Sequence, residues 1–282
     1  MNNTFDRVSE AFSRQSEMFD EYEKSNRILT WMRSVTRSHL LRHLKNNDII
    51  LELNAGTGLD AVYLAQRGFR IHCIDISEGM LNKLARKAAD LKLESLISYQ
   101  LLSFTGLDRL DKNSFDYIFS NFGGLNCTDN LDDLFQQIGR VLRPGGKVTL
   151  VIIPPVCPWE LALLFKGKFK TALRRLHKHG ITANIEGIEL KTYYHGYHKT
   201  VKALGNDFKI IESQGLASIS PPPYMINFPV LYPRLYRWLT KTDEKLSHLF
   251  PFNRWADHFI ITAIYQPQKN YIIENGNRYA GK

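Results

Sequence analysis

The sequence is poor in cysteine and has no long hydrophobic run, and these two absences exclude several classes of protein. Its three cysteines, Cys73, Cys127 and Cys157, are too few and too widely spaced for a disulfide framework or a metal site. No apolar run approaches the roughly 18 residues that a membrane-spanning helix needs. Residues 1–24 are too charged to act as a secretory signal. We therefore expect a cytoplasmic protein that binds no metal.

Acidic residues are also scarce, but only in the second half of the chain. Residues 1–150 contain 19 basic and 19 acidic residues, so the whole formal net charge of +9 lies in residues 151–282. Hydrophobic residues make up 44% of the chain, an ordinary value for a globular protein. Any surface that attracts anions is therefore expected in the second half.

The chain has no internal repeat, and from residue 48 short apolar runs alternate with helical patterns. This alternation predicts an α/β fold, a parallel sheet covered by helices on both faces. The predicted strands are 48–53, 69–75, 96–102, 115–121 and 147–153, and the predicted helices are 25–45, 59–67, 77–92 and 129–142. Further along we expect a basic amphipathic helix pair at 161–180, a short helix within 193–204, and an edge hairpin made by strands at 208–218 and 257–266.

A glycine turn, "GTGLDA" at 56–61, follows the first predicted strand and satisfies the dinucleotide-binding pattern G-x-G-x-x-G/A. Glu52 argues against a dinucleotide, because its carboxylate would face the pyrophosphate and like charges repel. The same carboxylate suits a ligand that carries an ammonium group, and S-adenosylmethionine is such a ligand. Asp75, at the end of the second strand, is suited to accept hydrogen bonds from ribose hydroxyls.

Four motifs together resemble the core of the class I S-adenosylmethionine-dependent methyltransferases. They are "ELNAGTG" at 52–58, "IDISEGML" at 74–81, "FDYIFSN" at 115–121 and "VLRPGGKVTL" at 141–150. The resemblance covers residues 48–153 and implies a Rossmann-like, doubly wound, mostly parallel seven-stranded sheet with an antiparallel edge hairpin. It also implies S-adenosyl-L-methionine as the cofactor and a helical lid on the substrate side.

The resemblance implies a set of cofactor-binding residues along these motifs. Carried over by position, the set is Tyr22, Glu52, Asn54, Ala55, Gly56, Gly58, Asp75, Ile76, Met80, Ser103, Phe104 and Asn121. Three positions depart from the family pattern. Asn54 replaces a glycine, which its tolerance of left-handed backbone geometry allows, and Ser103 replaces an aspartate. Phe19 stands where a tyrosine is frequent, so Tyr22 is our candidate for that role.

The acceptor side of the site is less clearly marked. The stretch "KTYYHGYHKT" at 191–200 falls between the fifth strand and the edge hairpin, and we select Tyr194 and His195 as catalytic candidates. The alternative is that these tyrosines are packing residues and the histidines lie on the surface. No D/N-P-P-Y/F motif follows Asn121, which disfavours methylation of nucleic-acid bases.

The basic segment 166–178 could contact anionic lipid headgroups, RNA phosphates or an acidic substrate, or could simply be a solvated helix face. Beside the Pro-rich, aromatic stretch 219–238, it fits a lid over an apolar pocket. We expect peripheral contact with a membrane through this segment.

The predicted organisation has four parts. They are an N-terminal helical lid (1–47), a cofactor-binding core (48–153), substrate-side insertions with an edge strand near 208–216 (154–256), and a last edge strand with a C-terminal tail (257–282).

The favoured function is methylation of a small, apolar or aromatic acceptor, with O-methylation slightly preferred. The alternatives are an RNA methyltransferase, a non-catalytic protein with the cofactor fold, and an NAD(P)-linked oxidoreductase, which Glu52 opposes. The oligomeric state stays open.

Overall fold

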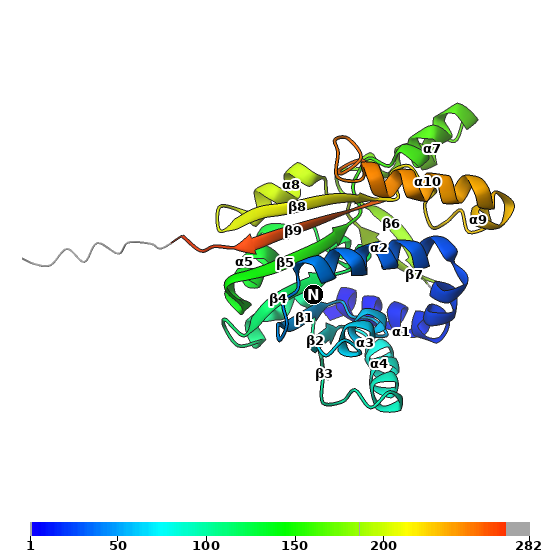
Figure 1. The fold of residues 1–282 in the computed structure, drawn as a ribbon. Coiled ribbons are helices and arrows are strands. Elements are labelled where there is room, and N and C mark those ends of the chain that lie inside the picture. The colour runs from blue at the N-terminus through cyan, green and yellow to red at the C-terminus, as the bar shows by residue number, and fades with distance from the viewer. Residues whose placement is uncertain (1, 186, 269–282) are drawn as a thin grey trace, which may run out of the picture.

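A seven-stranded sheet in the order β3-β2-β1-β4-β5-β9-β8 forms the centre of the computed structural model, which describes residues 2–185 and 187–268 (Figure 1). Its strands are β1 (Ile49–Leu53), β2 (Arg70–Asp75), β3 (Ile97–Leu101), β4 (Phe115–Ser120), β5 (Leu142–Ile152), β8 (Phe208–Leu216) and β9 (His258–Tyr265). β1 to β5 pair in parallel, whereas β9 lies between β5 and β8 and is antiparallel to both. The predicted Rossmann-like sheet with an antiparallel edge hairpin is confirmed.

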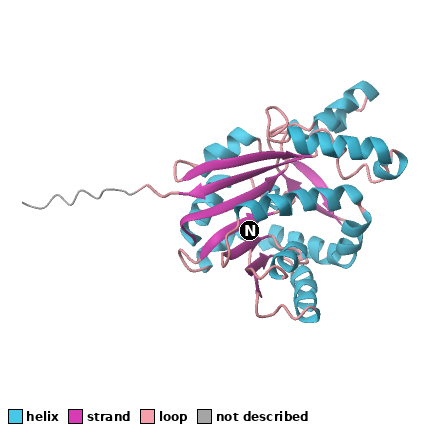
Figure 2. Ribbon diagram, viewed as in Figure 1, coloured by secondary structure: helices cyan, strands magenta, loops and turns pink. Residues whose placement is uncertain are grey.

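Helices cover both faces of this sheet (Figure 2). They are α2 (Arg27–His43), α3 (Leu59–Ala65) and α4 (Glu78–Asp90) on one face, and α5 (Leu131–Val141) and α8 (Tyr197–Leu204) on the other. Leu51 of β1 packs into the cluster under α5, while its neighbour Ile50 packs into the cluster under α3 and α4. Successive side chains of a strand point to opposite faces, so a sheet that is buried on both sides has continuously apolar strands.

The N-terminal lid consists of α1 (Asn2–Ser25) and α2, which meet at Asn26. The Asn26 side chain accepts hydrogen bonds from the amides of Ile28 at 3.1 Å and Leu29 at 3.3 Å, and so caps α2. α1 lies against α4 and against a small hairpin of β6 (Ile181–Ile185) and β7 (Ile188–Thr192). The sequence analysis did not predict this hairpin.

The second half contains short helices where two longer ones were predicted. The segment 158–176 forms α6 (Pro158–Leu161), η3 (Ala162–Lys166), α7 (Phe169–Leu173) and η4 (Arg174–Leu176). Two more helices, α9 (Phe228–Leu231) and α10 (Pro233–Leu246), follow β8, and two 3-10 turns, η1 (Phe104–Arg109) and η2 (Gly124–Cys127), flank β4. In the predicted C-terminal part, residues 269–282 lie outside the described residues. Across residues 2–185 and 187–268, none of the helices has the length and apolar character required to cross a bilayer.

Candidate cofactor and acceptor site

A cavity of about 940 Å³ opens at the carboxyl edge of the parallel strands. Its walls come from the lid helices, from the turns after β1, β2 and β4, and from the start of β9. Ligands of open α/β sheets bind at this edge. The volume is at the upper end of the range for small-molecule sites, so the cavity can hold two ligands side by side.

The glycine turn after β1 has the backbone that the sequence requires. Gly56 and Gly58 have φ angles of +55° and +76°, and a Cβ atom on Gly58 would lie 2.6 Å from Cγ of Leu84. Asn54 also adopts a left-handed conformation, with φ +48°. Its side chain accepts from the Ser120 hydroxyl at 2.6 Å and donates to the Asn121 carbonyl at 3.1 Å. Asn54 therefore joins the ends of β1 and β4 while making the turn.

Asp75 fixes the turns that follow both β1 and β2. Its carboxylate accepts hydrogen bonds from the amides of Gly56 at 2.8 Å and Ser77 at 2.9 Å. Burial raises the pKa of Asp75, while these amide hydrogen bonds oppose the rise. Each carboxylate oxygen has a further lone pair, and Asp75 lines the cavity, so it can accept from a ligand as well.

Glu52 is a buried carboxyl group that faces the same cavity. It is 3% exposed, and the sole hydrogen bond to its side chain among the described residues comes from the Cys73 thiol at 3.9 Å. Burial raises the pKa of Glu52 well above its ordinary value, and the carboxylate of Asp60 raises it further. A cation bound beside Glu52 would stabilise its carboxylate and so oppose both causes of the raised pKa.

A network of buried ion pairs lies between this carboxyl group and the lid. Arg33 of α2 forms ion pairs with Asp60 of α3 and with Glu23 of α1, the latter at 2.8 Å. Asp60 also accepts from Arg37 at 2.7 Å and from the Asn121 amide at 2.7 Å. These charges are paired and hydrogen-bonded, as buried charges must be, and they attach α1 and α2 to the cavity wall.

The lid helix α1 is also attached directly to the cofactor side. Asp20 accepts a hydrogen bond from the Thr57 hydroxyl at 2.6 Å and forms an ion pair with Lys87 of α4. The Ser13 hydroxyl bonds to the Ser77 hydroxyl at 2.9 Å. Because Thr57 belongs to the glycine turn, the position of α1 depends on the geometry of that turn.

Most of the predicted cofactor residues lie on the cavity wall. Those that line it are Tyr22, Glu52, Asn54, Ala55, Gly56, Asp75, Ile76, Met80, Phe104 and Asn121. Gly58 and Ser103 do not. Gly58 packs against Leu84 beneath the turn, and the Ser103 hydroxyl accepts from the Thr105 amide at 3.1 Å, where it caps η1.

The two catalytic candidates do not lie on the cavity wall. His195 is fully buried, and its Nε2 bonds to the Thr128 carbonyl at 2.8 Å. The Arg175 guanidinium lies over the Tyr194 ring, with its Cζ atom 5.6 Å from the ring centroid. Tyr194 thus has the packing position of the alternative interpretation, whereas His195 is buried and does not lie on the surface as that interpretation expected.

His258 lines the cavity instead, and the sequence analysis missed it. It begins β9, and its Nδ1 bonds to the Asp257 carboxylate at 2.9 Å. In the sequence it was only the polar start of an apolar strand. No local pattern shows that β9 inserts beside β5 and so brings this residue to the carboxyl edge.

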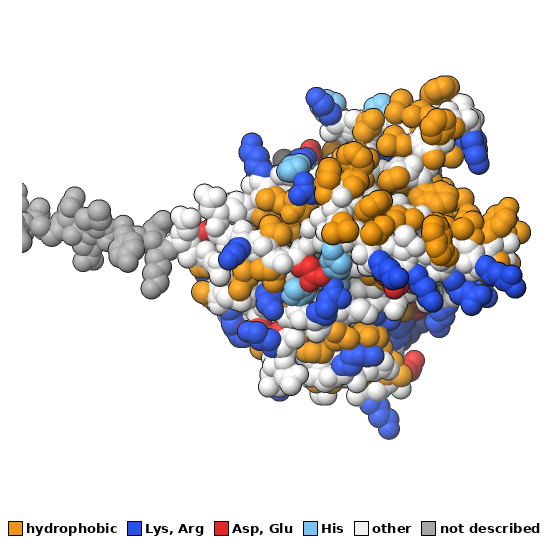
Figure 3. All heavy atoms as spheres, turned by 45° about the horizontal axis from the view of Figure 1, so that its top comes forward, with side chains coloured by type: hydrophobic (Ala, Val, Ile, Leu, Met, Phe, Trp, Pro, Cys, Tyr) orange, Lys and Arg blue, Asp and Glu red, His pale blue; other side chains and the backbone are white. Residues whose placement is uncertain are grey.

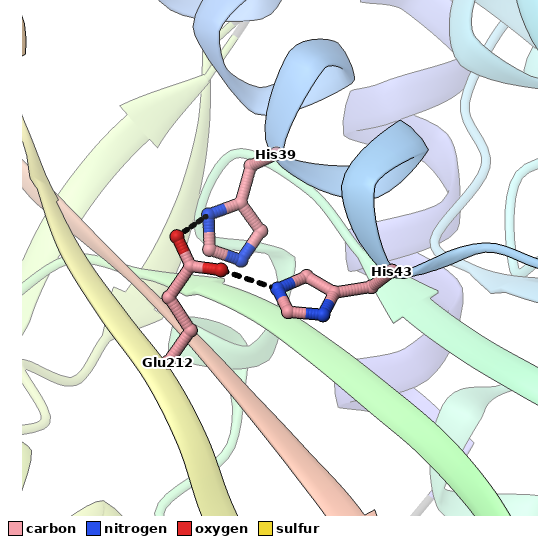
Figure 4. A group of neighbouring side chains, drawn as sticks. All are labelled: His39, His43 and Glu212. Carbon is pink, nitrogen blue, oxygen red and sulfur yellow. Dashed lines mark hydrogen bonds and ion pairs between the residues drawn. The ribbon is translucent and has the colours of Figure 1, made fainter.

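Two groups of side chains have the chemistry of metal ligands, but each already contacts an arginine. His39, His43 and Glu212 meet between α2 and β8 (Figure 4), and Arg42 donates to Glu212 at 2.6 Å. Cys157, Glu160 and Asp257 meet under η4, and Arg175 forms ion pairs with both carboxylates. We assign no metal to either group.

Residues 50–146 match the family model described as a methyltransferase domain. With the seven-stranded sheet and the glycine turn, this match shows that the chain contains a domain of the class I S-adenosylmethionine-dependent methyltransferase type.

Among its curated relatives is the demethylmenaquinone methyltransferase of Leptospira interrogans, 30% identical over 145 residues, which are 49% of this chain and 57% of that protein. The ubiquinone/menaquinone biosynthesis C-methyltransferase of Rickettsia typhi is 32% identical over 155 residues, 52% of this chain and 58% of that one. The chain thus spans less than two thirds of the length of these relatives.

Solved structures share the fold. A putative S-adenosylmethionine-dependent methyltransferase from Listeria monocytogenes superposes with a TM-score of 0.57 at 17% identity, covering 84% of this chain and 99% of that one. The geranyl diphosphate C-methyltransferase of Streptomyces coelicolor A3(2) gives a TM-score of 0.54 at 16% identity, covering 83% and 79%.

Proposed function

We propose that this protein transfers a methyl group from S-adenosylmethionine to a small acceptor held in the same cavity. The observation that carries the proposal is Glu52, a buried carboxyl group that faces the cavity without a cationic or amide donor of its own. A phosphate-bearing dinucleotide would meet this group unfavourably, whereas an α-ammonium group would complement it. The match to methyltransferases supports the same choice.

The wall of the cavity fits the parts of the cofactor. Glu52 would hold the ammonium end, and Asp75 would accept from the ribose hydroxyls. Ile76, Met80 and Phe104 would pack on the adenine. When bound, the cofactor supplies an electrophilic methyl group on its sulfonium.

The acceptor is an apolar or aromatic small molecule in this proposal. The cavity wall also includes Phe12, Phe122 and Ile153, and burying apolar surface against such side chains is the main source of affinity for an apolar ligand. Relatives named for quinone substrates fit an aromatic ring. We keep the preference for an oxygen atom as the methylated position, although some of these relatives are named as C-methyltransferases.

The first test is isothermal titration with S-adenosylmethionine, S-adenosylhomocysteine and NAD. We expect saturable binding of both adenosyl compounds and none of NAD. Asp75→Ala should weaken adenosyl binding about tenfold or more, since it loses charged hydrogen bonds. The control is Asp90→Ala, the same change at the exposed end of α4. Binding of NAD alone, or of none of the three ligands, would contradict the proposal.

We also propose that the chain contacts a membrane surface through an apolar and basic face near the cavity, which we call the docking face. It comprises η3, α7, α9 and α10, over which hydrophobic side chains gather (Figure 3). Phe165 is 95% exposed, Phe169 62% and Trp238 60%. Exposed aromatic residues beside Lys166, Lys168 and Lys170 have the composition of interfacial helices that bind anionic lipid.

The docking face is joined to the lid of the cavity. The Asn26 amide, between α1 and α2, donates to the Pro223 carbonyl at 3.0 Å, and Met225 packs with Ile28 of α2. Ser25 and Leu29, on either side of this contact, line the cavity. An apolar acceptor could therefore pass from a lipid surface to the cavity over a short distance.

Flotation with vesicles of neutral and of anionic lipid tests the docking face. The variant replaces Lys166, Lys168 and Lys170 by Gln and leaves out Arg174 and Arg175, because both are paired with Glu160. We expect binding to anionic vesicles to fall about 100-fold, since each of the three lysines contributes about 1 kcal/mol. The control replaces the exposed Lys92, Lys112 and Lys209 in the same way. Equal losses in both variants would contradict a specific face.

A further inference from the structure

His258 occupies the position from which a side chain can reach an acceptor. β9 runs antiparallel to β5, with Phe259 opposite Ile152, so the start of β9 lies at the carboxyl edge of the parallel strands. The His258 ring packs edge-on against Phe122 at a centroid distance of 5.9 Å, and both residues line the cavity. Phe122 belongs to the turn after β4, whereas Phe104 begins η1 after β3.

Asp257 orients the imidazole. Its Oδ2 accepts from Nδ1 of His258 at 2.9 Å, and its Oδ1 accepts from Arg175 at 2.6 Å. Arg175 also donates to the Asp257 backbone carbonyl at 2.9 Å and to Glu160 at 2.9 Å. The carboxylate is thus held from two sides and cannot rotate away from the ring.

This arrangement selects one tautomer of His258. Burial by itself would raise the pKa of Asp257, but the charges of His258 and Arg175 lower this pKa to about 2. An ionised carboxylate accepts the Nδ1 proton, so in the neutral ring the lone pair is on Nε2. Among the described residues no hydrogen bond occupies Nε2, and the residue is 7% exposed on the cavity wall.

We propose that His258 is the general base of the methyl transfer and that Asp257 is its positioning residue. The acceptor then carries a hydroxyl group on an aromatic or enolic carbon, an O–H acidic enough for imidazole to deprotonate. This inference rests on the function proposed above and adds the chemical class of its substrate.

The step balances without any other reactant. Nε2 of His258 takes the hydroxyl proton and the ring becomes imidazolium. The acceptor oxyanion, or the ring carbon to which it delivers its electron pair, forms the bond to the methyl carbon. The carbon–sulfur bond breaks and its electron pair stays on sulfur. His258 later releases its proton to water, and for C-methylation the ring proton leaves the same way.

The groups around the His258–Asp257 pair are either joined in ion pairs or protonated at neutral pH. Facing the pair are Arg175 from η4 and Glu160 from α6, which are joined in an ion pair. The other neighbours are the Cys157 thiol and the Tyr194 and Tyr224 hydroxyls, whose pKa values are all raised, chiefly by burial. These three groups are protonated at neutral pH.

The experiment compares wild type with His258→Asn and His258→Gln in the presence of S-adenosylmethionine. The acceptor probes are 1,4-naphthalenediol, catechol and 4-nitrophenol, and products are identified by mass spectrometry. Asn at 258 retains a donor near Nδ1 for Asp257, whereas Gln places an amide near Nε2. Both lack a base, so we expect kcat at pH 7 to fall 100-fold or more. Cofactor affinity should change less than twofold, which shows that the variants are folded.

The pH profile separates a base from a packing residue. A general base acts in its unprotonated form, so the wild-type kcat should fall toward acid pH. Both variants should lose this dependence of kcat on pH. Above the pKa of the acceptor hydroxyl, their rates should approach the wild-type rate. His179→Gln, the same change at an exposed histidine, is the control.

Three results would overturn the inference, and each differs from failure of the proposed function. Variants with wild-type kcat would show that His258 is not the base. If the variants have a low kcat at every pH, His258 has a packing role instead. A wild type that binds the cofactor but methylates none of the three probes would refute the hydroxyl acceptor, whereas failure to bind the cofactor at all would refute the proposed function itself.

Discussion

At the scale of single residues, Glu52 lowers folding stability at neutral pH. Its pKa is raised by burial and by Asp60, so the folded state holds this proton more tightly than the unfolded state. The stability that the protonated group provides is present below its ordinary pKa of 4.5 and is lost as pH rises through the raised value. At neutral pH the buried carboxyl group is therefore a cost that a bound cation can offset.

Replacing Glu52→Gln is expected to have opposite effects on folding and on binding. The melting temperature should rise at pH 8 and change little at pH 4, because only the ionised carboxylate is unfavourable. Affinity for S-adenosylmethionine should fall about 10-fold or more as a charged contact is lost. Differential scanning fluorimetry and isothermal titration measure the two effects. Glu94→Gln, at an exposed site, is the control. An equal rise in melting temperature at both pH values would contradict this explanation.

Residues whose roles follow from backbone geometry were predictable, and residues whose roles depend on distant strands were not. Asn54 could be given a left-handed conformation from the sequence because it stands in a glycine motif, and its φ of +48° confirms this. The local sequence does not show which of His195 and His258 reaches the cavity. One is buried against the Thr128 carbonyl and the other faces the cavity because β9 inserts between β5 and β8.

At the scale of elements, the lid helix α1 is held by contacts of unequal strength. Asp20 bonds to the Thr57 hydroxyl of the glycine turn and pairs with the half-buried Lys87. One turn earlier, Glu17 pairs with Lys83 at 2.9 Å, but the Glu17 side chain is 71% exposed. Exposed pairs contribute only about 0–1 kcal/mol, so of these two residues Asp20 contributes more to holding α1 over the cavity.

Asp20→Ala is therefore expected to loosen the lid, and Glu17→Ala to leave it in place. With Asp20 replaced, amide hydrogens of α1 should exchange faster and S-adenosylhomocysteine should dissociate several times faster, since about 1 kcal/mol of interaction is lost. Hydrogen–deuterium exchange and stopped-flow dissociation measure these changes. If Glu17→Ala loosens α1 as much as Asp20→Ala does, the contact with the glycine turn is not what holds the lid.

Some of the elements that the sequence did not predict are held by α1. β6 and β7 form a two-stranded sheet, and Ile188 and Leu190 of β7 pack against Ala11 of α1. Both strands alternate apolar and polar residues, but each has five residues and their packing partner is a helix about 180 residues earlier. The parallel strands contain short, largely apolar runs, and the sequence analysis located all five strands from these runs.

At the scale of the whole molecule, a chain of buried polar groups joins the N-terminal helices to the last strands. Nε2 of His39 bonds to Thr262 of β9 at 2.7 Å, Thr262 to Thr149 of β5 at 2.7 Å, and Thr149 to Tyr117 of β4 at 2.5 Å. On its other side, Nδ1 of His39 contacts Gln214 of β8 at 3.0 Å. Four strands of the sheet and α2 thus share one network.

Folding stability should depend on the charge state of His39. Its pKa is lowered to about 4, chiefly because burial disfavours the charged ring, while the unfolded chain takes up this proton near the ordinary value of 6.5. His39 is thus neutral at pH 7, and its contact with Glu212 in Figure 4 is then no ion pair. The stability that depends on the neutral ring is fully present above pH 6.5 and is lost as pH falls toward 4.

Urea denaturation of wild type and of His39→Gln at pH 7.5, 6.0 and 5.0 tests this expectation. At pH 7.5 the variant should be less stable by about 1–3 kcal/mol, because the amide cannot satisfy every buried partner of the ring. The difference should shrink as pH falls, since wild type alone loses the contribution of a neutral His39. His177→Gln, at an exposed histidine, should follow the wild type. A difference that stays constant from pH 7.5 to 5.0 would mean that His39 contributes only packing, and that α2 is held on the sheet independently of pH.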